Sequence, residues 1–145
     1  MSDCPAEGSD DERTVKTLIA EDNSTSRLLL QELLNSHGQV RTAVNGREAV
    51  AAVRLALKTA ESYELICLDI MLPKMDGQEA LKETRRIESA ASVAGSNRTR
   101  IVMTSTLAVQ EEVRGAIRRK CDCFLARPIQ KANLLEELHK LALIS

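Results

Sequence analysis

The clearest indication of the fold is the sequence LICLD at positions 65–69, followed by IMLPKMDG at 70–77. An uninterrupted apolar run of this length predicts a strand that is buried on both faces. Pro73 and the Asp-Gly pair at 76–77 predict that the chain then turns and does not resume the strand. Asp69 therefore ends a buried strand, at the edge where open α/β sheets bind ligands. Taken alone, an acid in that place more often caps a helix or pairs with a loop cation, so the rest of the chain must decide between these interpretations.

The composition describes one aliphatic domain. The chain has 145 residues, of which 43% are hydrophobic and only 1% aromatic, so Leu, Ile, Val and Ala must build the core. A net charge of -1 gives no basic face for nucleic acid. No segment approaches the ~18 apolar residues of a membrane span, and the first residues lack the apolar core of a secretory signal. We expect a cytoplasmic protein with a disordered acidic tail at 1–14 and a single domain at 15–145.

The four cysteines do not predict a disulfide framework, because the chain looks cytosolic and is not short. Cys67 lies inside the apolar strand and is expected to be a small core residue. Cys121 and Cys123 are separated by one residue, whereas zinc and redox motifs typically have two. A zinc site there stays open but is disfavoured.

Five apolar segments alternate with amphipathic ones. Strands are predicted at 15–20, 39–44, 65–69, 100–103 and 123–126, and helices at 24–36, 45–60, 77–88, 109–117 and 131–144. Such alternation favours right-handed crossovers and a parallel sheet with helices on both faces, an α/β fold. Polar residues at 89–99 predict a long connector.

Helix ends are marked by residues with known capping preferences. Asn23 precedes the first helix and Asn45 the second, where Glu48 three residues later resembles a capping box. Gly38 is expected to close the first helix in a left-handed conformation.

The carboxyl ends of the predicted strands carry the polar chemistry. The first strand ends in Glu21 and Asp22, the third in Asp69, the fourth in Thr104 and the fifth in Arg127. If the first and third strands are neighbours, three carboxylates crowd one place, and their mutual repulsion favours a hard cation. Oxygen ligands without a nearby histidine or cysteine match Mg²⁺.

A site of this kind can take a phosphoryl group. Asp69 can act as the nucleophile that forms an acyl phosphate. A metal ion, the Thr104 hydroxyl and the Arg127 cation would stabilise the charge on the transferring oxygens. Ser105 competes with Thr104 for the hydroxyl role, and Arg127 could instead only neutralise the acids.

These residues resemble the receiver domain of two-component response regulators over roughly positions 16–143. The resemblance implies a flavodoxin-like, doubly wound sheet of (βα)5 type with strand order 2-1-3-4-5. It implies that Glu21 and Asp22 are the acidic pair, that Asp69 is the phosphoacceptor, and that the Met71 carbonyl is a metal ligand.

Further matches carry the resemblance along the chain. The run D-x-x-x-P-x-x-x-G from Asp69 to Gly77 is similar to the family's loop after the third strand. Thr104 matches the family's hydroxyl, and Phe124 matches the aromatic switch position, although it could equally be a static core residue. The family has lysine where this chain has Arg127, and Pro128 resembles the proline that usually follows a cis bond there.

The resemblance implies a stand-alone receiver that takes phosphate on Asp69 from a histidine kinase or phosphotransfer protein, with Mg²⁺ required. It would pass the signal to an unidentified downstream protein. The expected role is that of a phosphoryl acceptor with at most intrinsic dephosphorylation, and not that of an enzyme. A surplus of leucines on the last predicted helix, together with Val109 and Ile117 on the preceding one, also suits a homodimer.

Three other functions compete with this one. A degenerate receiver would dock a partner without phosphorylation, and Arg127 is its main support. A Mg²⁺-dependent phosphatase would need a second acid shortly after Asp69, where Ile70 and Met71 stand. A DNA-binding regulator is disfavoured because no basic module follows the last helix.

Overall fold

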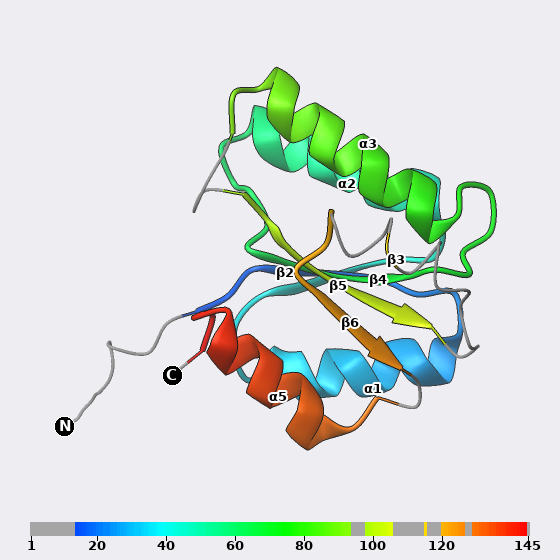
Figure 1. The fold of residues 1–145 in the computed structure, drawn as a ribbon, viewed down its shortest axis with the longest axis vertical. Helices are drawn as coiled ribbons and strands as arrows, with labels where there is room; N and C mark the ends of the chain where they lie inside the picture. Colours follow the sequence, from blue (N-terminus) through cyan, green and yellow to red (C-terminus); the bar gives the residue numbers. More distant parts are fainter. Residues whose placement is uncertain (1–13, 94–97, 106–114, 116–119, 127–128, 145) are drawn as a thin grey trace, which may run out of the picture.

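The computed structural model describes residues 14–93, 98–105, 115, 120–126 and 129–144. Its strands form one parallel sheet (Figure 1). They are β2 (Thr17–Ala20), β3 (Val40–Ala43), β4 (Leu65–Asp69), β5 (Arg100–Ser105) and β6 (Cys123–Ala126). Their spatial order is β3-β2-β4-β5-β6. Because β2 comes first along the chain, this is the predicted order 2-1-3-4-5, and the flavodoxin-like α/β fold is confirmed.

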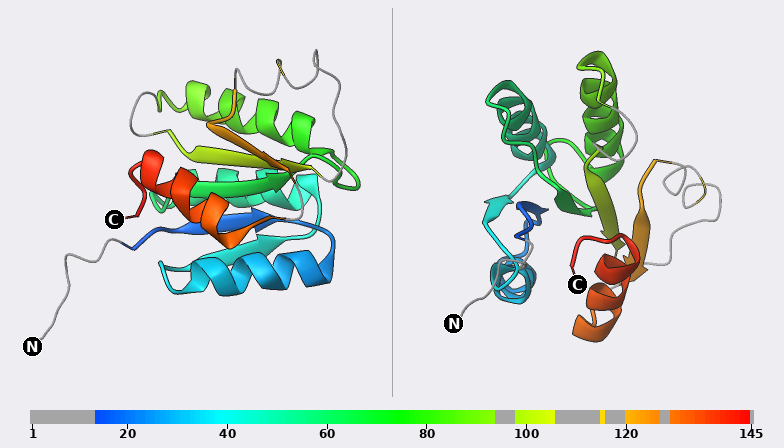
Figure 2. Two further views of the ribbon diagram at one scale, coloured as in Figure 1. Left: turned by 60° about the horizontal axis from the view of Figure 1, so that its bottom comes forward. Right: turned by 90° about the vertical axis from the view of Figure 1, so that its left-hand side faces the viewer.

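Helices cover both faces of the sheet, as predicted. α1 (Ser24–Asn35) and α5 (Lys131–Lys140) lie on one face, while α2 (Gly46–Lys58) and α3 (Gly77–Ala90) lie on the other (Figures 1 and 2). The helix predicted at 109–117 lies outside the described residues, apart from the isolated position 115.

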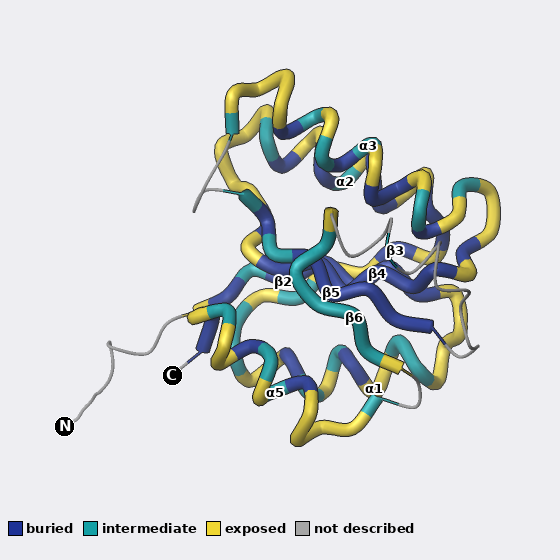
Figure 3. The backbone as a smooth tube through the Cα atoms, viewed as in Figure 1, coloured by how far each residue is buried: buried dark blue, intermediate teal, exposed yellow. Residues whose placement is uncertain are grey.

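Alternating strand residues supply two separate cores. Leu18 of β2 and Ile66 of β4 pack toward α2 and α3, while their neighbours Ile19 and Leu65 pack toward α1 and α5. Every residue of β4 is buried, which is what the apolar run at 65–69 predicted. The central strands are accordingly dark along their length in Figure 3.

The edge strand β3 is less buried than its pattern suggested. Val40, Thr42 and Val44 alternate along the strand predicted at 39–44 and so share one face, but Thr42 and Val44 are exposed. Val40 packs in part against the α1 side, and Ala43 is buried on the other. An edge strand has only one neighbour, so the covering helices do not shield its whole face.

The predicted helix starts are confirmed by hydrogen bonds. Asn23 Oδ1 accepts from the Ser26 N–H at 2.9 Å, and Asn45 Oδ1 accepts from the Glu48 N–H at 2.9 Å. Glu48 Oε1 in turn accepts from the Val44 N–H at 3.0 Å. In a usual capping box the glutamate accepts from the N–H of the N-cap residue, here Asn45. In this protein it accepts from the N–H of the residue before the cap.

Two helices end earlier than predicted, because residues other than glycine take the left-handed conformation. α2 ends at Lys58, not near Ala60, and α5 ends at Lys140, not at Ile144. Ala60 has φ of 57° and Ala142 has φ of 61°. In each case the next N–H bonds back five residues: Glu61 to Ala56 at 2.8 Å, and Leu143 to Leu138 at 3.0 Å.

Gly38 does not close α1 in the way predicted. The helix ends at Asn35 with Ser36 as its cap, so Gly38 lies beyond the capping positions. Its φ is 150°, and a Cβ atom there would collide with the Val15 backbone. A close approach of two chain segments, and not a left-handed helix cap, requires this glycine.

The last described residues fold back onto the sheet. After the turn at Ala142, Leu143 and Ile144 are 6% and 9% exposed and join the core between the sheet, α1 and α5. The turn that shortens α5 therefore adds two apolar side chains to the interior.

The described cysteines lie in different parts of the structure. Cys67 is buried, as expected, and burial raises its thiol pKa to about 12. Cys121 packs toward α2 and α3 but Cys123 toward α1 and α5, so the two do not face a common site.

No helix in the described part of the chain is long and apolar enough to cross a bilayer.

Candidate metal centre

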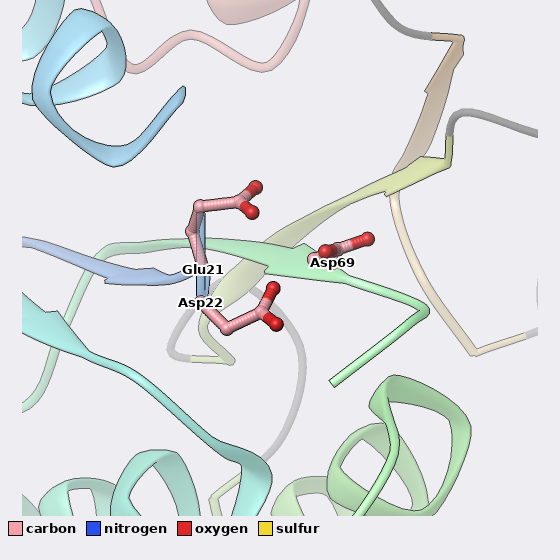
Figure 4. A group of neighbouring side chains, drawn as sticks. All are labelled: Glu21, Asp22 and Asp69. Atoms are coloured by element: carbon pink, nitrogen blue, oxygen red, sulfur yellow. The ribbon is translucent and has the colours of Figure 1, made fainter. Parts of the chain in front are cut away.

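Three carboxylates meet at the carboxyl edge of the sheet. Glu21 and Asp22 follow β2, and Asp69 ends the adjacent strand β4. One ligand oxygen from each lies within 4.8 Å of the others (Figure 4). The predicted juxtaposition of these three acids is therefore present, and it follows from the neighbouring positions of β2 and β4 in the sheet.

Local contacts hold the first acid in place. Glu21 is 1% exposed, and its Oε2 accepts a hydrogen bond from the Asn23 N–H at 3.1 Å. Arg27 on α1 donates to the Glu21 carbonyl at 3.0 Å, which ties the start of the helix to the end of β2. Asp22 is exposed to solvent. The site thus combines a buried carboxylate with an open one.

Asp69 is buried at 4% exposure, and its Oδ1 accepts from the Met71 N–H at 3.2 Å. Burial is the main cause that raises the pKa of its carboxyl group, and the charge of Asp22 raises it further. Hydrogen bonds from the backbone of Met71 and Ile70 act in the opposite direction. An ionised Asp69 is therefore costly here, and a cation would relieve that cost.

The loop after β4 is built tightly around the site. The Gly77 N–H donates to the Ile70 carbonyl at 2.9 Å, and a Cβ atom on Gly77 would collide with the Asp69 carbonyl oxygen. The loop also touches the start of α2, where a Cβ on Gly46 would collide with Met75. The glycine that ends the D-x-x-x-P-x-x-x-G run is therefore required by the close contact between α3 and β4.

Thr104 lies beside Asp69 in the sheet. The two residues are register partners across β4 and β5, and the Ile70 N–H donates to the Thr104 carbonyl at 3.0 Å. Side chains alternate along β5: Val102 packs on the α1 side, and Met103 on the α3 side. Thr104 therefore shares the face of Asp69, while Ser105 falls on the opposite face. Of the two hydroxyl residues, Thr104 is therefore better placed than Ser105 for the predicted contact with a phosphoryl group.

The other predicted site residues are only partly defined by the structure. Met71 is 57% exposed and binds Asp69 through its N–H, so the metal-binding role of its carbonyl stays a prediction. Phe124 on β6 is partly buried against the core that α2 and α3 cover. Arg127 and Pro128 lie outside the described residues.

One contact at the site was not predicted. The sequence predicts only a helix start after Asn45, but Gly46 also lies against the loop that follows β4. Its N–H donates to the Pro73 carbonyl at 3.4 Å, and a Cβ there would collide with Met75. Nothing in the local sequence indicates this, because it joins segments far apart in the chain.

A family model for the response regulator receiver domain matches residues 17–139. The chain belongs to that family. Receiver domains are signalling modules of two-component and phosphorelay systems, so the resemblance stated from the motifs is confirmed, and the strand order agrees with it.

Two curated relatives are each 32% identical to this receiver domain. One is the sensory/regulatory protein RpfC of Xanthomonas campestris, matched over 90% of this chain and 17% of its own length. The other is the chemotaxis protein CheY of Bacillus subtilis, matched over 86% of this chain and 95% of its own length. The chain thus spans a small part of the first relative and nearly all of the second.

Among solved structures, the receiver domain of the histidine kinase CKI1 from Arabidopsis thaliana is similar to this one. Complexed with Mg²⁺ and BeF3⁻, it has a TM-score of 0.72 and 27% identity, with 90% of this chain and 93% of that chain covered.

Proposed function

We propose that this receiver domain accepts a phosphoryl group on Asp69 in a reaction that requires Mg²⁺. The observation that carries the proposal is the cluster of Glu21, Asp22 and Asp69, with ligand oxygens within 4.8 Å of one another. Membership of the receiver family and the Mg²⁺ and BeF3⁻ bound by the CKI1 domain support it.

The donor set fits Mg²⁺. All three side chains offer carboxylate oxygens, which this hard cation prefers. Glu21, Asp22 and Asp69 would hold the ion, and the Met71 carbonyl would add a backbone ligand. When bound, Mg²⁺ supplies positive charge beside the three carboxylates and the incoming phosphoryl oxygens.

The chemistry uses the chain's own nucleophile. A carboxylate oxygen of Asp69 attacks the phosphorus of a phosphohistidine, an O–P bond forms, and the N–P bond to the donor imidazole breaks. The proton that the imidazole takes up comes from solvent. The Thr104 hydroxyl would then donate to a phosphoryl oxygen, and the Arg127 cation would contact another.

The proposed donor is a histidine kinase or a histidine phosphotransfer protein, since one relative is named as an osmosensing histidine protein kinase and the similar CKI1 receiver domain comes from a histidine kinase. The phosphoryl group carries roughly two negative charges at neutral pH in place of the single charge of the Asp69 carboxylate, which changes the surface around the site. We propose that a further protein reads this change. A homodimer through α5 and the preceding segment stays a second proposal.

The decisive measurement is intact mass after incubation with acetyl phosphate and Mg²⁺. We expect one phosphoryl adduct, which disappears with EDTA and in Asp69→Asn. Asp76→Asn is the matched control, because Asp76 caps α3 through a bond to the Glu79 N–H and lies outside the cluster. It should be phosphorylated like the wild type.

The alternative is a receiver that docks a partner without phosphorylation. Absence of both the adduct and beryllofluoride binding would favour it, and Arg127→Lys would then test whether the arginine is the cause. Mg²⁺-dependent turnover of a generic phosphate ester would instead indicate a phosphatase.

A further inference from the structure

A largely buried arginine joins α3 to the strands at the edge of the sheet opposite the acidic cluster. The Arg85 side chain is 12% exposed. Its guanidinium donates to the Lys120 carbonyl at 2.8 Å, to the Thr99 carbonyl at 2.8 Å, to Glu88 Oε1 at 2.7 Å and to Asp122 Oδ2 at 3.0 Å. The planar fork of arginine suits several fixed acceptors at once.

The acceptors are themselves tied to the sheet. Asp122 Oδ2 accepts from the Ile101 N–H at 2.8 Å, so it links the start of β6 to β5. Glu88 Oε2 accepts from the Thr99 N–H at 2.7 Å, and the Thr99 hydroxyl donates to the Tyr63 carbonyl at 2.8 Å. The network therefore fixes the residues that lead into β4, β5 and β6 relative to one helix.

The same helix touches Asp69 at its other end. Gly77, the first residue of α3, packs against the Asp69 carbonyl and donates to Ile70. α3 has 14 residues, which span about 21 Å at 1.5 Å per residue. A displacement of the loop after β4 can therefore move α3 as a rigid body, and Arg85 lies where that movement would reach β6.

β6 carries Phe124, which packs against the same core as Leu81 of α3. We propose that Arg85 is a positioning residue that couples the state of Asp69 to β6, because it fixes the start of that strand to α3. The inference rests on the proposed phosphorylation of Asp69 and names part of its regulation. The simpler alternative is that the network only stabilises the fold.

Because aromatic residues are so few, two positions can each be labelled with a single ¹⁹F probe. The chain has one phenylalanine, one tyrosine and no tryptophan. 4-Fluorophenylalanine therefore gives a single ¹⁹F resonance at Phe124, and fluorotyrosine gives one at Tyr63, whose carbonyl is bonded to the network. Each resonance can be followed while Mg²⁺ and beryllofluoride are added to the whole chain.

The test compares Arg85→Lys with Arg86→Lys. Arg86 is the next residue of the same helix, but it is 61% exposed, and within the described part of the chain its side chain bonds to Glu83 alone, three residues earlier. In the wild type and Arg86→Lys, beryllofluoride should shift the Phe124 resonance. In Arg85→Lys, the shift should fall about twofold or more while beryllofluoride affinity is kept.

Asp122→Asn is the second variant, in case Arg85→Lys does not fold, and it should show the same loss. A full-sized Phe124 shift in a folded, destabilised variant would mean that the network is only structural and would overturn the proposal. Loss of beryllofluoride binding in both variants would also overturn it, because the network would then support the site itself. A wild type that binds no beryllofluoride would instead contradict the proposed function.

Discussion

Burial disfavours the charge of the Asp69 carboxylate. Its burial and the nearby Asp22 raise its pKa above the ordinary value, so ionisation at neutral pH weakens the folded state. We therefore expect Asp69→Asn to raise the Tm by a few degrees in metal-free buffer at neutral pH. Thermal unfolding followed by circular dichroism measures this, and Asp76→Asn should leave the Tm nearly unchanged because asparagine caps a helix equally well.

The pH dependence of that difference has a defined sign. Below the unfolded pKa of about 3.9, Asp69 is protonated in both states and asparagine gives no advantage. The advantage grows as the pH rises through the interval between the unfolded and the raised folded pKa, and it is constant above that. An advantage of Asp69→Asn that is the same at every pH would contradict the electrostatic explanation.

Among individual residues, the sequence predicted that three carboxylates would lie together, but it did not predict the contacts of Arg85. Glu21, Asp22 and Asp69 could be found because strand ends on adjacent parallel strands share one edge. The Arg85 network could not, because Arg85, Thr99 and Asp122 are polar residues in segments that the sequence assigns only as helix, connector and strand start.

Helix ends depend on backbone conformations that the sequence does not mark. Alanine in the left-handed region is about 1–2 kcal/mol less favourable than glycine. We expect Ala60→Gly to stabilise the domain by about 1 kcal/mol in chemical denaturation, since Ala60 is exposed with φ of 57°. Ala51→Gly is the control of opposite sign: Ala51 is exposed inside α2, where glycine costs about 1 kcal/mol.

The same conformations explain why the ends of α2 and α5 were mispredicted. Left-handed residues after helices are usually glycine, which the sequence would have signalled. Here alanine takes that role at positions 60 and 142, and serine at position 92. The N-terminal caps were predictable because asparagine side chains make the bonds themselves.

Gly77, the first residue of α3, lies where this helix makes its close contact with the end of β4. We expect Gly77→Ala to destabilise the domain by about 1–3 kcal/mol, because the added Cβ overlaps the Asp69 carbonyl and the Ile70 backbone. Gly115→Ala is the matched control, since a Cβ there meets no described atom within 4 Å. Equal unfolding free energies for the two variants would argue against a tight contact at Gly77.

Metal binding should be visible in the stability of the whole molecule. A ligand that binds only the folded state at 100 times its Kd stabilises it by about 2.7 kcal/mol. We expect Mg²⁺ to raise the unfolding free energy of the wild type and of Asp76→Asn in urea titrations. Asp69→Asn should gain much less, because it removes one of the three carboxylates. A gain of equal size in all three proteins would place the ion elsewhere.

The topology was the most predictable feature of the whole molecule. Strand–helix alternation and aliphatic runs determine a parallel sheet with two covered faces, and the family resemblance added the strand order. Burial at the edges was less predictable, as Thr42 and Val44 demonstrate, because exposure there depends on how far the neighbouring helices extend.

The turn after α5 has a practical consequence for protein engineering. Because Leu143 and Ile144 are packed in the interior, an affinity tag or reporter joined directly to the carboxyl end would leave from a buried point and compete with that packing. A fusion at the amino end, or a hydrophilic spacer after Ser145, avoids this competition. A biosensor built on this domain should therefore carry its reporter at the amino end or behind such a spacer.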